Sequence, residues 1–425
     1  MNKVDIQEEF GGFKAYLVCL FSALFFFFIF IQMNCWNVLS DHFVSLFNLT
    51  GSQAVSLFQM YFFGNVLCLF PAGLLLDRVS TRWVLVTAML VTVFAVYGFC
   101  FSHVLWQVKL CRFLIGCCGS FCLLAPVRLI SRWFPAEKIA LMVGLVVTIA
   151  MLGGMVAQAP LRYLVSSSNY ETAMKVNIAF GVVCWLLIFI VVRDAPAGRD
   201  TEAHAHAELS GMGFFSSVTQ VLKNSQNWLA GIYASLINLP VFWLGGYKGG
   251  DYLQQVDHLT AKQSSFVVGL LFIGLIFGSP LFGYFSDKIK RRRLPMVVGA
   301  CAAIVVTLLI TWVDIQNETL LAVLFFLLGV VISSQVISYP LVVESNSLSL
   351  TGTAEGVTSV LIMSGGFTTS IMLFFLEKGK TAHHATIFKA LGWHWALSAL
   401  IGCFVIALAL SIIIRETRCK HYDAK

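Results

Sequence analysis

Two cationic side chains stand in the first third of an apolar stretch at 105–130, where a charge is costly. Lys109 and Arg112 are three residues apart, so a helix places them on one face. The stretch holds no Asp or Glu, and the two cations therefore need a counter-charge from another segment or from an anionic ligand. Lys109 has a third alternative, because its long side chain can extend to a polar surface. We expect Arg112 and Lys109 to bind an anion.

A second polar cluster closes another apolar stretch, where four glycines alternate with aromatic and charged residues from Trp243 to Tyr252. Glycine weakens a helix, so we expect this one to unwind here. Irregular backbone inside an apolar medium is tolerated where it lines a cavity or is buried in protein. We interpret Tyr247 and Lys248 as binding groups of an outer gate. The alternative is that Lys248 simply pairs with Asp251.

Few acidic residues are placed to carry protons. Asp251, Glu344 and Glu355 lie near the ends of apolar stretches, and they are the candidates for proton coupling. The twelve cysteines are scattered through apolar segments without metal-ligand spacing, so they are interpreted as packing residues. We expect no metal and no cofactor, and a solvated linker is the preferred interpretation of His204 and His206.

The composition is that of an integral membrane protein. Hydrophobic residues make up 58% of the 425 residues and charged residues 12%, against roughly 25% charge in soluble domains. Phosphate-loop and dinucleotide signatures are absent, and basic residues cluster in short loops, which argues against an enzyme and against nucleic-acid binding. Apolar runs long enough to span a bilayer occur at 14–37, 53–76, 83–102, 105–130, 139–165, 173–193, 227–247, 264–286, 295–313, 319–342, 355–376 and 390–414.

The distribution of positive charge gives an orientation. Most of the 28 Lys and Arg residues fall in the terminal segments and in every second loop, which predicts both termini in the cytoplasm. One long polar connection, 194–224, divides the spans into two sets of six. We therefore expect an N-terminal six-helix bundle at 1–193, a cytoplasmic linker at 194–224 and a C-terminal six-helix bundle at 225–425.

A short charged motif occurs once in each half of the chain. Gly73-Leu-Leu-Leu-Asp77-Arg78-Val-Ser-Thr-Arg82 returns as Gly283-Tyr-Phe-Ser-Asp287-Lys-Ile-Lys-Arg-Arg292. This pattern resembles the loop between helices 2 and 3 of the major facilitator superfamily, which is repeated weakly between helices 8 and 9. The resemblance implies two pseudo-symmetric six-helix bundles that alternate access to a central site. It also implies gating roles for Asp77, Arg78, Arg82, Asp287 and Arg292.

Other segments extend the resemblance over nearly the whole chain. Arg112-Phe-Leu-Ile-Gly116 is similar to the Arg-x-x-x-Gly pattern of helix 4, and Gly352-Thr-Ala-Glu-Gly356 to the start of helix 11. In this superfamily helices 1, 4, 7 and 10 line the central path. Carried over by position, the implied substrate-binding residues are Gln32, Arg112, Asn238, Trp243, Gln335 and Tyr339.

We therefore expect an all-α membrane protein with twelve transmembrane helices, in a bacterial inner membrane and monomeric. Its expected function is secondary transport of a small polar, anionic or zwitterionic solute, with H⁺ as a candidate coupling ion. Intramembrane cations, and no acids inside the spans of helices 1, 2, 4 and 5, favour an anion over a cationic drug. An efflux pump for amphipathic compounds and a nutrient sensor with a transporter fold remain the alternatives, and a channel is disfavoured.

Overall fold

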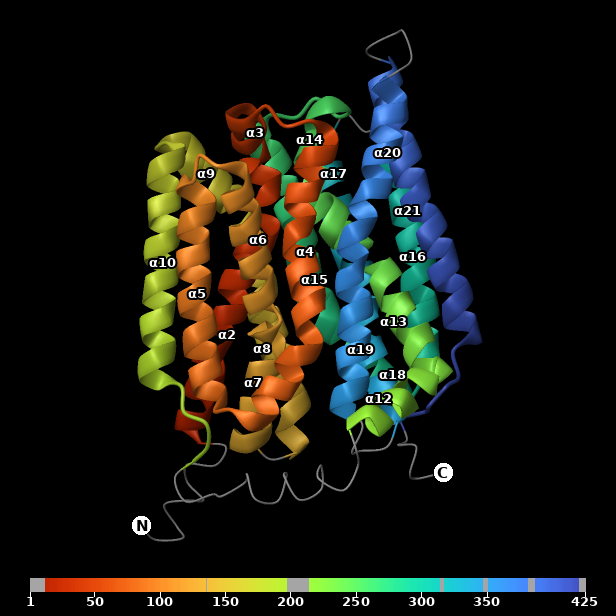
Figure 1. The fold of residues 1–425 in the computed structure, drawn as a ribbon. Coiled ribbons are helices and arrows are strands. Elements are labelled where there is room, and N and C mark those ends of the chain that lie inside the picture. The colour runs from red at the N-terminus through yellow and green to blue at the C-terminus, as the bar shows by residue number, and fades with distance from the viewer. Residues whose placement is uncertain are drawn as a thin grey trace. The chain divides into compact units, whose positions relative to one another are not determined.

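The computed structural model describes residues 12–134, 136–196, 214–313, 317–346, 351–380 and 387–419. Within these ranges the chain is helical and contains no strand (Figure 1). The first half of the chain forms α2 (Phe13–Asn34), α3 (Trp36–Phe47), α4 (Gly51–Arg78), α5 (Thr81–Phe101), α6 (Leu105–Gly119), α7 (Phe121–Trp133), α8 (Ala136–Val156), α9 (Ala159–Ser167) and α10 (Tyr170–Val191).

The second half contains three segments that are not α-helical. The π-helix is η1 (Val241–Lys248), and the two 3₁₀-helices are η2 (Ser333–Ile337) and η4 (Gly365–Thr368). The α-helices of this half are α12 (Phe214–Lys223), α13 (Ser225–Ile237), α14 (Gly249–Gln255), α15 (Ala261–Ile289), α16 (Arg293–Trp312), α17 (Glu318–Ile332), α18 (Ser338–Glu344), α19 (Thr351–Ser364), α20 (Thr369–Lys380) and α21 (Ile387–Ile413).

The predicted spans coincide with these helices. Among the described residues, eleven helical stretches are long and apolar enough to cross a membrane. The remaining predicted span, 53–76, lies within α4. Several spans are made of consecutive elements, since α13, η1 and α14 follow one another without a loop, as do α17, η2 and α18. The predicted all-α membrane architecture is confirmed.

Polar side chains mark where helices begin. The Asn169 side chain accepts from the backbone N–H of Thr172 at the start of α10, with 2.7 Å between the atoms. Thr260 and Gln263 form a reciprocal capping box at the start of α15. Each cap satisfies a backbone donor that lacks a partner in the first turn of a helix. Short loops can therefore connect the long helices of this chain.

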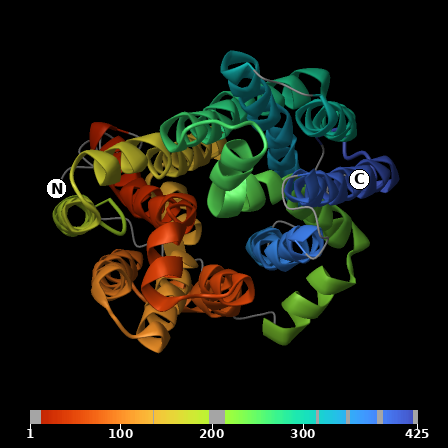
Figure 2. The ribbon, with the colours of Figure 1, turned by 90° about the horizontal axis from the view of Figure 1, so that it is seen from above.

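The described chain divides into two compact units, and each combines several segments. Unit 1 comprises residues 1–33, 60–153 and 164–213, and unit 2 comprises 34–59, 154–163 and 214–425. Within unit 1, α5 packs against α6 and α10. Within unit 2, α13 packs against α19 and α21 (Figure 2). These packing units are not the sequence halves, and the division into 1–193, 194–224 and 225–425 stays a prediction.

Each unit contains a pair of helices whose backbones touch reciprocally through glycines. In unit 1, a Cβ on Gly64 would lie 2.2 Å from the Phe113 carbonyl oxygen, and one on Gly116 would lie 2.0 Å from that of Tyr61. In unit 2, Gly274 and Gly329 have the same reciprocal arrangement, with carbonyl oxygens at 2.1 Å from each Cβ position. Gly64 and Gly274 are separated by the same number of residues as Asp77 and Asp287, so the internal repeat extends to the packing.

Candidate functional site

Arg112 is fully buried in unit 1 at the point where α2 ends. Its guanidinium donates to the backbone carbonyls of Gln32 and Met33, the latter at 3.2 Å. The last carbonyls of a helix lack intrahelical partners and carry partial negative charge, so a cation there is stabilising. Arg112 therefore holds the end of α2, at the break before α3.

Aromatic and amide groups complete the surroundings of Arg112. The guanidinium carbon lies 5.6 Å from the ring centre of Tyr61 and 5.4 Å from that of Phe99. The predicted binding residue Gln32 is buried and exchanges two side-chain hydrogen bonds with Asn177, at 3.2 and 3.3 Å. The structure thus brings Arg112 and Gln32 together, while Lys109 lies one turn earlier in α6 and is half-buried.

Unit 2 gathers the other predicted binding residues around the irregular segments. The side chain of Gln335, in η2, donates to Asn238 Oδ1 at 2.8 Å. The Trp243 indole, in η1, donates to Thr368 Oγ1 of η4 at 2.8 Å. Tyr339 follows in α18 and is half-buried. Thr368 is a polar residue of a predicted span that was not among the predicted binding residues.

The predicted irregular helix occurs at the expected glycines. The π-helix η1 ends at Lys248, whose φ of −136° and ψ of 15° interrupt the helix before α14. Tyr247 is buried with its ring centre 5.0 Å from that of Phe58. Lys248 forms an ion pair with Asp251, which is the alternative considered for this pair. A role of Tyr247 and Lys248 in an outer gate stays a prediction.

Gly249→Ala tests whether the π-turn depends on glycine. The backbone N–H of Gly249 bonds the carbonyl of Leu244, five residues earlier, and a Cβ at this glycine would lie 2.1 Å from that oxygen. Because backbone atoms must shift to make room, we expect a loss of about 1–3 kcal/mol of stability, measured as a lower melting temperature. Gly402→Ala is the control, since a Cβ there meets nothing within 4 Å. Equal melting temperatures for the two variants would contradict the requirement.

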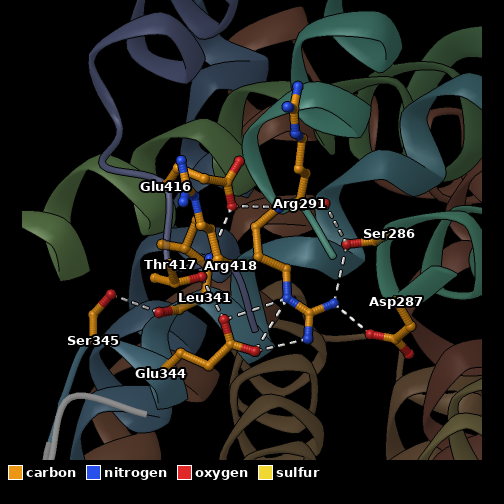
Figure 3. A network of polar contacts seen from close by, with 10 residues as sticks. Ser286, Asp287, Arg291, Leu341, Glu344, Ser345, Glu416, Thr417 and Arg418 are labelled. Atoms are coloured by element: carbon orange, nitrogen blue, oxygen red, sulfur yellow. Dashed lines mark hydrogen bonds and ion pairs between the residues drawn. The ribbon is translucent and has the colours of Figure 1, made fainter. Parts of the chain in front are cut away.

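An ion network in unit 2 contains two predicted gating residues, Asp287 and Arg292, and the proton-coupling candidate Glu344 (Figure 3). Arg292 Nη2 lies 2.7 Å from Glu344 Oε1, and Arg292 Nη1 lies 2.6 Å from Asp287 Oδ1. The Arg292 and Glu344 side chains are only 9% and 10% exposed, whereas Asp287 is 69% exposed. Burial alone would lower the pKa of Arg292, but its bonds to Glu344 and Asp287 raise that pKa above its usual value.

The network also fixes the start of α16. The Glu416 carboxylate accepts from the backbone N–H groups of Arg292 and Arg293, at 2.7 and 3.0 Å, and the Thr417 hydroxyl donates to Glu344. Glu416 follows α21, so the acid after the last helix caps another helix of the same unit. The sequence did not single out Glu416 or Thr417.

Unit 1 contains a corresponding arrangement. Asp194 follows α10 and accepts from the backbone N–H of Arg82 at 2.9 Å and from the Ser80 hydroxyl. Arg132 Nη1 lies 3.6 Å from the same carboxylate. Arg82 also donates through its side chain to the Phe189 carbonyl at 3.0 Å. An acid after one helix thus caps the helix that begins at the repeated motif in both units.

The remaining predicted residues are placed less fully. Glu355 lies in α19 and is half-buried. Asp77 and Arg78 close α4, but their side chains lie outside those that the structure describes, as do His204 and His206. Among the described residues, no group of three or more His, Cys, Asp or Glu side chains is placed to hold a metal ion. The substrate, gating and proton-coupling roles of the predicted residues remain proposals.

The helical architecture, the reciprocal glycine contacts and the corresponding ion networks define a membrane-protein fold with an internal repeat. The Major Facilitator Superfamily model matches residues 18–370, and the chain belongs to this family. Relatives of this family are transporters, and the expectation of a transporter rather than a soluble enzyme agrees with that.

Curated relatives are 23–27% identical to this chain over the aligned residues. The uncharacterized MFS-type transporter MT3072 of Mycobacterium tuberculosis is 27% identical over 63% of this chain, which spans 58% of that relative. A probable hexose phosphate transport protein of Chlamydia trachomatis is 24% identical over 67% of this chain and 65% of the relative. A D-galactonate transporter of Escherichia coli is 23% identical over 80% of this chain and 84% of the relative.

Solved structures with the same fold include a D-xylose-proton symporter, with a TM-score of 0.73 at 13% identity, covering 96% of this chain and 99% of the other. A bacterial homologue of the human lysosomal transporter Spinster gives a TM-score of 0.71 at 16% identity, covering 96% and 97%. At these identities the likeness shows the fold alone.

Proposed function

We propose that this chain is a secondary transporter of a small anionic solute with a polar, hydroxyl-bearing body. The carrying observation is Arg112, a cation that is fully buried in unit 1 and held by backbone carbonyls and aromatic faces. Lys109 lies on the same face of α6, and the spans at 14–37, 53–76, 105–130 and 139–165 contain no acid. A positive potential in this region favours an anion.

The relatives support the same class of solute. By their names, one carries hexose phosphate and one carries D-galactonate, and both solutes join a negative charge to several hydroxyl groups. Amide, indole and hydroxyl groups of unit 2, such as Gln335, Trp243 and Thr368, are suited to hydrogen bonding with hydroxyls. We assign the anion to Arg112.

Alternating access is the proposed mechanism, with the sequence halves 1–193 and 225–425 as the moving bodies and 194–224 as their linker. The repeated motif and its ion networks form the cytoplasmic gate, to which Asp77, Arg78, Arg82, Asp287 and Arg292 belong. Asp251, Glu344 and Glu355 are the proposed proton carriers, although Asp251 is paired with Lys248 and Glu344 with Arg292. We place the protein in an inner membrane, as a monomer with both termini in the cytoplasm.

A thermal-shift screen of the purified protein in nanodiscs tests the solute class. A ligand that binds the folded state stabilises it by RT ln(1 + [L]/Kd), about 2.7 kcal/mol at a hundredfold excess over Kd, and so raises the melting temperature. We expect sugar acids or sugar phosphates to stabilise the protein, and matched neutral sugars to do so less. Uptake of the stabilising anion into proteoliposomes then follows. Stabilisation only by cationic or neutral amphipathic compounds would overturn the proposal in favour of efflux.

The same screen separates transport from sensing. A nutrient sensor with this fold binds its ligand but does not move it, so proteoliposomes would show stabilisation without uptake or counterflow. The aromatic content of 14% is compatible with an amphipathic cargo, which is why amphipathic compounds belong in the screen.

A further inference from the structure

The series of π-type hydrogen bonds in η1 ends at Gly249, and the next backbone N–H, that of Gly250, bonds a side chain instead. In a π series each N–H bonds the carbonyl five residues before it, and Gly249 bonds Leu244 in this way. The next bond of the series would join the N–H of Gly250 to the carbonyl of Gly245. The structure bonds both groups to amide side chains that come from distant parts of the chain.

Two amides bridge the interrupted pair. The N–H of Gly250 donates to Asn37 Oδ1 at 3.0 Å, and Asn37 Nδ2 donates to Gln158 Oε1 at 3.0 Å. Gln158 Nε2 then donates to the Gly245 carbonyl at 2.8 Å. Every donor meets an acceptor in the same direction, so the bridge is a continuous relay. Both amides are buried, where an unmade hydrogen bond costs about 1–3 kcal/mol.

The relay is also attached to the break between α2 and α3. Gln158 Nε2 lies 3.3 Å from the carbonyl oxygen of Asn34, and Arg162 Nη2 lies 3.3 Å from that of Asn37. A Cβ on Gly250 would lie 3.1 Å from Asn37 Oδ1, so the glycine lets the amide reach the backbone. All of these residues belong to unit 2. One cluster therefore links α3, the start of α9 and η1.

We propose that Asn37 and Gln158 form a latch that holds the predicted outer end of the chain closed, and that its opening is coupled to completion of the π series. When the amides withdraw, the Gly250 N–H and the Gly245 carbonyl are in register to bond each other. The backbone therefore keeps a partner in both states. This replacement lowers the cost of opening, because neither backbone group is left unsatisfied.

This gating role rests on the proposed alternating access, but the relay itself does not. Asn37 and Gln158 act on the backbone of η1 and are gating residues, not groups that we place on the solute. Their loss removes bonds that exist only in the closed arrangement. A mutation of either residue therefore favours opening, and mutation of both adds little, because one missing member already interrupts the relay.

Hydrogen exchange of the full-length protein in nanodiscs tests the relay. Asn37→Leu and Gln158→Met remove the polar groups at similar size. We expect the peptide that contains Gly250 to exchange about five- to tenfold faster in either variant. The Gly250 N–H is exposed while the backbone passes between the closed and open arrangements, and the loss of about one net hydrogen bond makes this passage more frequent. The double variant should exchange no faster than the single ones. Wild-type exchange in either single variant would overturn the relay.

A native thiol reports opening without any substrate. Cys35 is buried between α2 and α3 beside the relay, so N-ethylmaleimide should label it faster in the latch variants. Labelling of Cys184, buried in α10, is the internal reference. Unchanged Cys35 labelling would overturn the gating role, even if hydrogen exchange had risen.

Asn227→Ala is the matched control for general loss of stability. Asn227 is a buried amide of unit 2 that bonds the Val221 carbonyl at 2.9 Å and Asn346 at 3.1 Å, away from η1. It should leave both the Gly250 peptide and Cys35 at their wild-type rates. Equal effects in Asn227→Ala would show that the latch variants act by destabilisation, and would overturn the proposal. If the protein transported no solute, the proposed function would be wrong. Hydrogen exchange of the Gly250 peptide and labelling of Cys35 would still test the latch, because neither measurement needs a solute.

Discussion

Glu344→Ala is expected to lower the stability of the protein by about 3–5 kcal/mol, because it leaves a buried cation without its main partner. Arg292 is 9% exposed and lies 2.7 Å from the Glu344 carboxylate, while its other acid, Asp287, is 69% exposed and screened by water. The remaining ion pair therefore compensates only in part. The measurement is the melting temperature in nanodiscs, together with the rate of uptake, which should fall because we propose that this network is part of the cytoplasmic gate.

An apolar replacement of the whole pair separates the charge effect from packing. Arg292→Met with Glu344→Leu removes both charges, and we expect it to recover most of the stability lost in Glu344→Ala. Glu171→Gln is the exposed control, since Glu171 and Lys175 are an ion pair with side chains 63% and 65% exposed. A double variant as unstable as Glu344→Ala would contradict this explanation.

Arg112→Ala is expected to cost about 3–5 kcal/mol and to abolish uptake. The variant removes charge-assisted hydrogen bonds to two helix-end carbonyls, each of which contributes about 1.5–3 kcal/mol, and it leaves a cavity beside Tyr61 and Phe99. Arg112→Lys keeps the charge, but a compact ammonium does not reproduce the planar fork of donors. We expect an intermediate melting temperature for it.

Ligand binding to Arg112→Lys distinguishes a binding role from a purely structural one. If the cation also meets the anion, the variant that still folds should need a higher concentration of anion for the same thermal shift, and the shift by a matched neutral sugar should not change. The same thermal-shift titration with Lys109→Ala shows how much a half-buried cation on the same helix face contributes to anion binding. Wild-type uptake and stability in Arg112→Ala would remove Arg112 from both roles.

The sequence predicted the fold well because hydropathy and charge patterns report directly on spans and loops. The repeat of Asp77 and Arg82 as Asp287 and Arg292 also indicated where ion networks form. The partners were not predictable for a physical reason. Arg112 bonds backbone carbonyls, which every residue carries, and Glu416 lies beyond the last span, where acids are common. Nothing in the sequence distinguishes such partners from their neighbours.

Amides inside apolar spans were visible, but their pairing was not. Asn37 and Gln158 are separated by 121 residues, and only the folded chain shows that they meet each other and the backbone of η1. The glycines from Gly245 to Gly250 predicted an irregular helix correctly. They did not indicate that the irregularity is a π-helix whose last bond is supplied by side chains.

The reciprocal glycine contacts have a mechanical consequence. Where Gly64 meets the backbone at Phe113, and Gly274 meets that at Phe326, no flexible side chain separates the two helices. Such crossings resist sliding of one helix past the other, because backbone atoms in direct contact cannot adjust as side chains can. Elastic deformation within each unit must then concentrate in its compliant elements, which in unit 2 are the π-helix and the two 3₁₀ segments. These segments also carry the contacts of Gln335 with Asn238 and of Trp243 with Thr368, so the deformation would fall on the turns for which we propose solute binding.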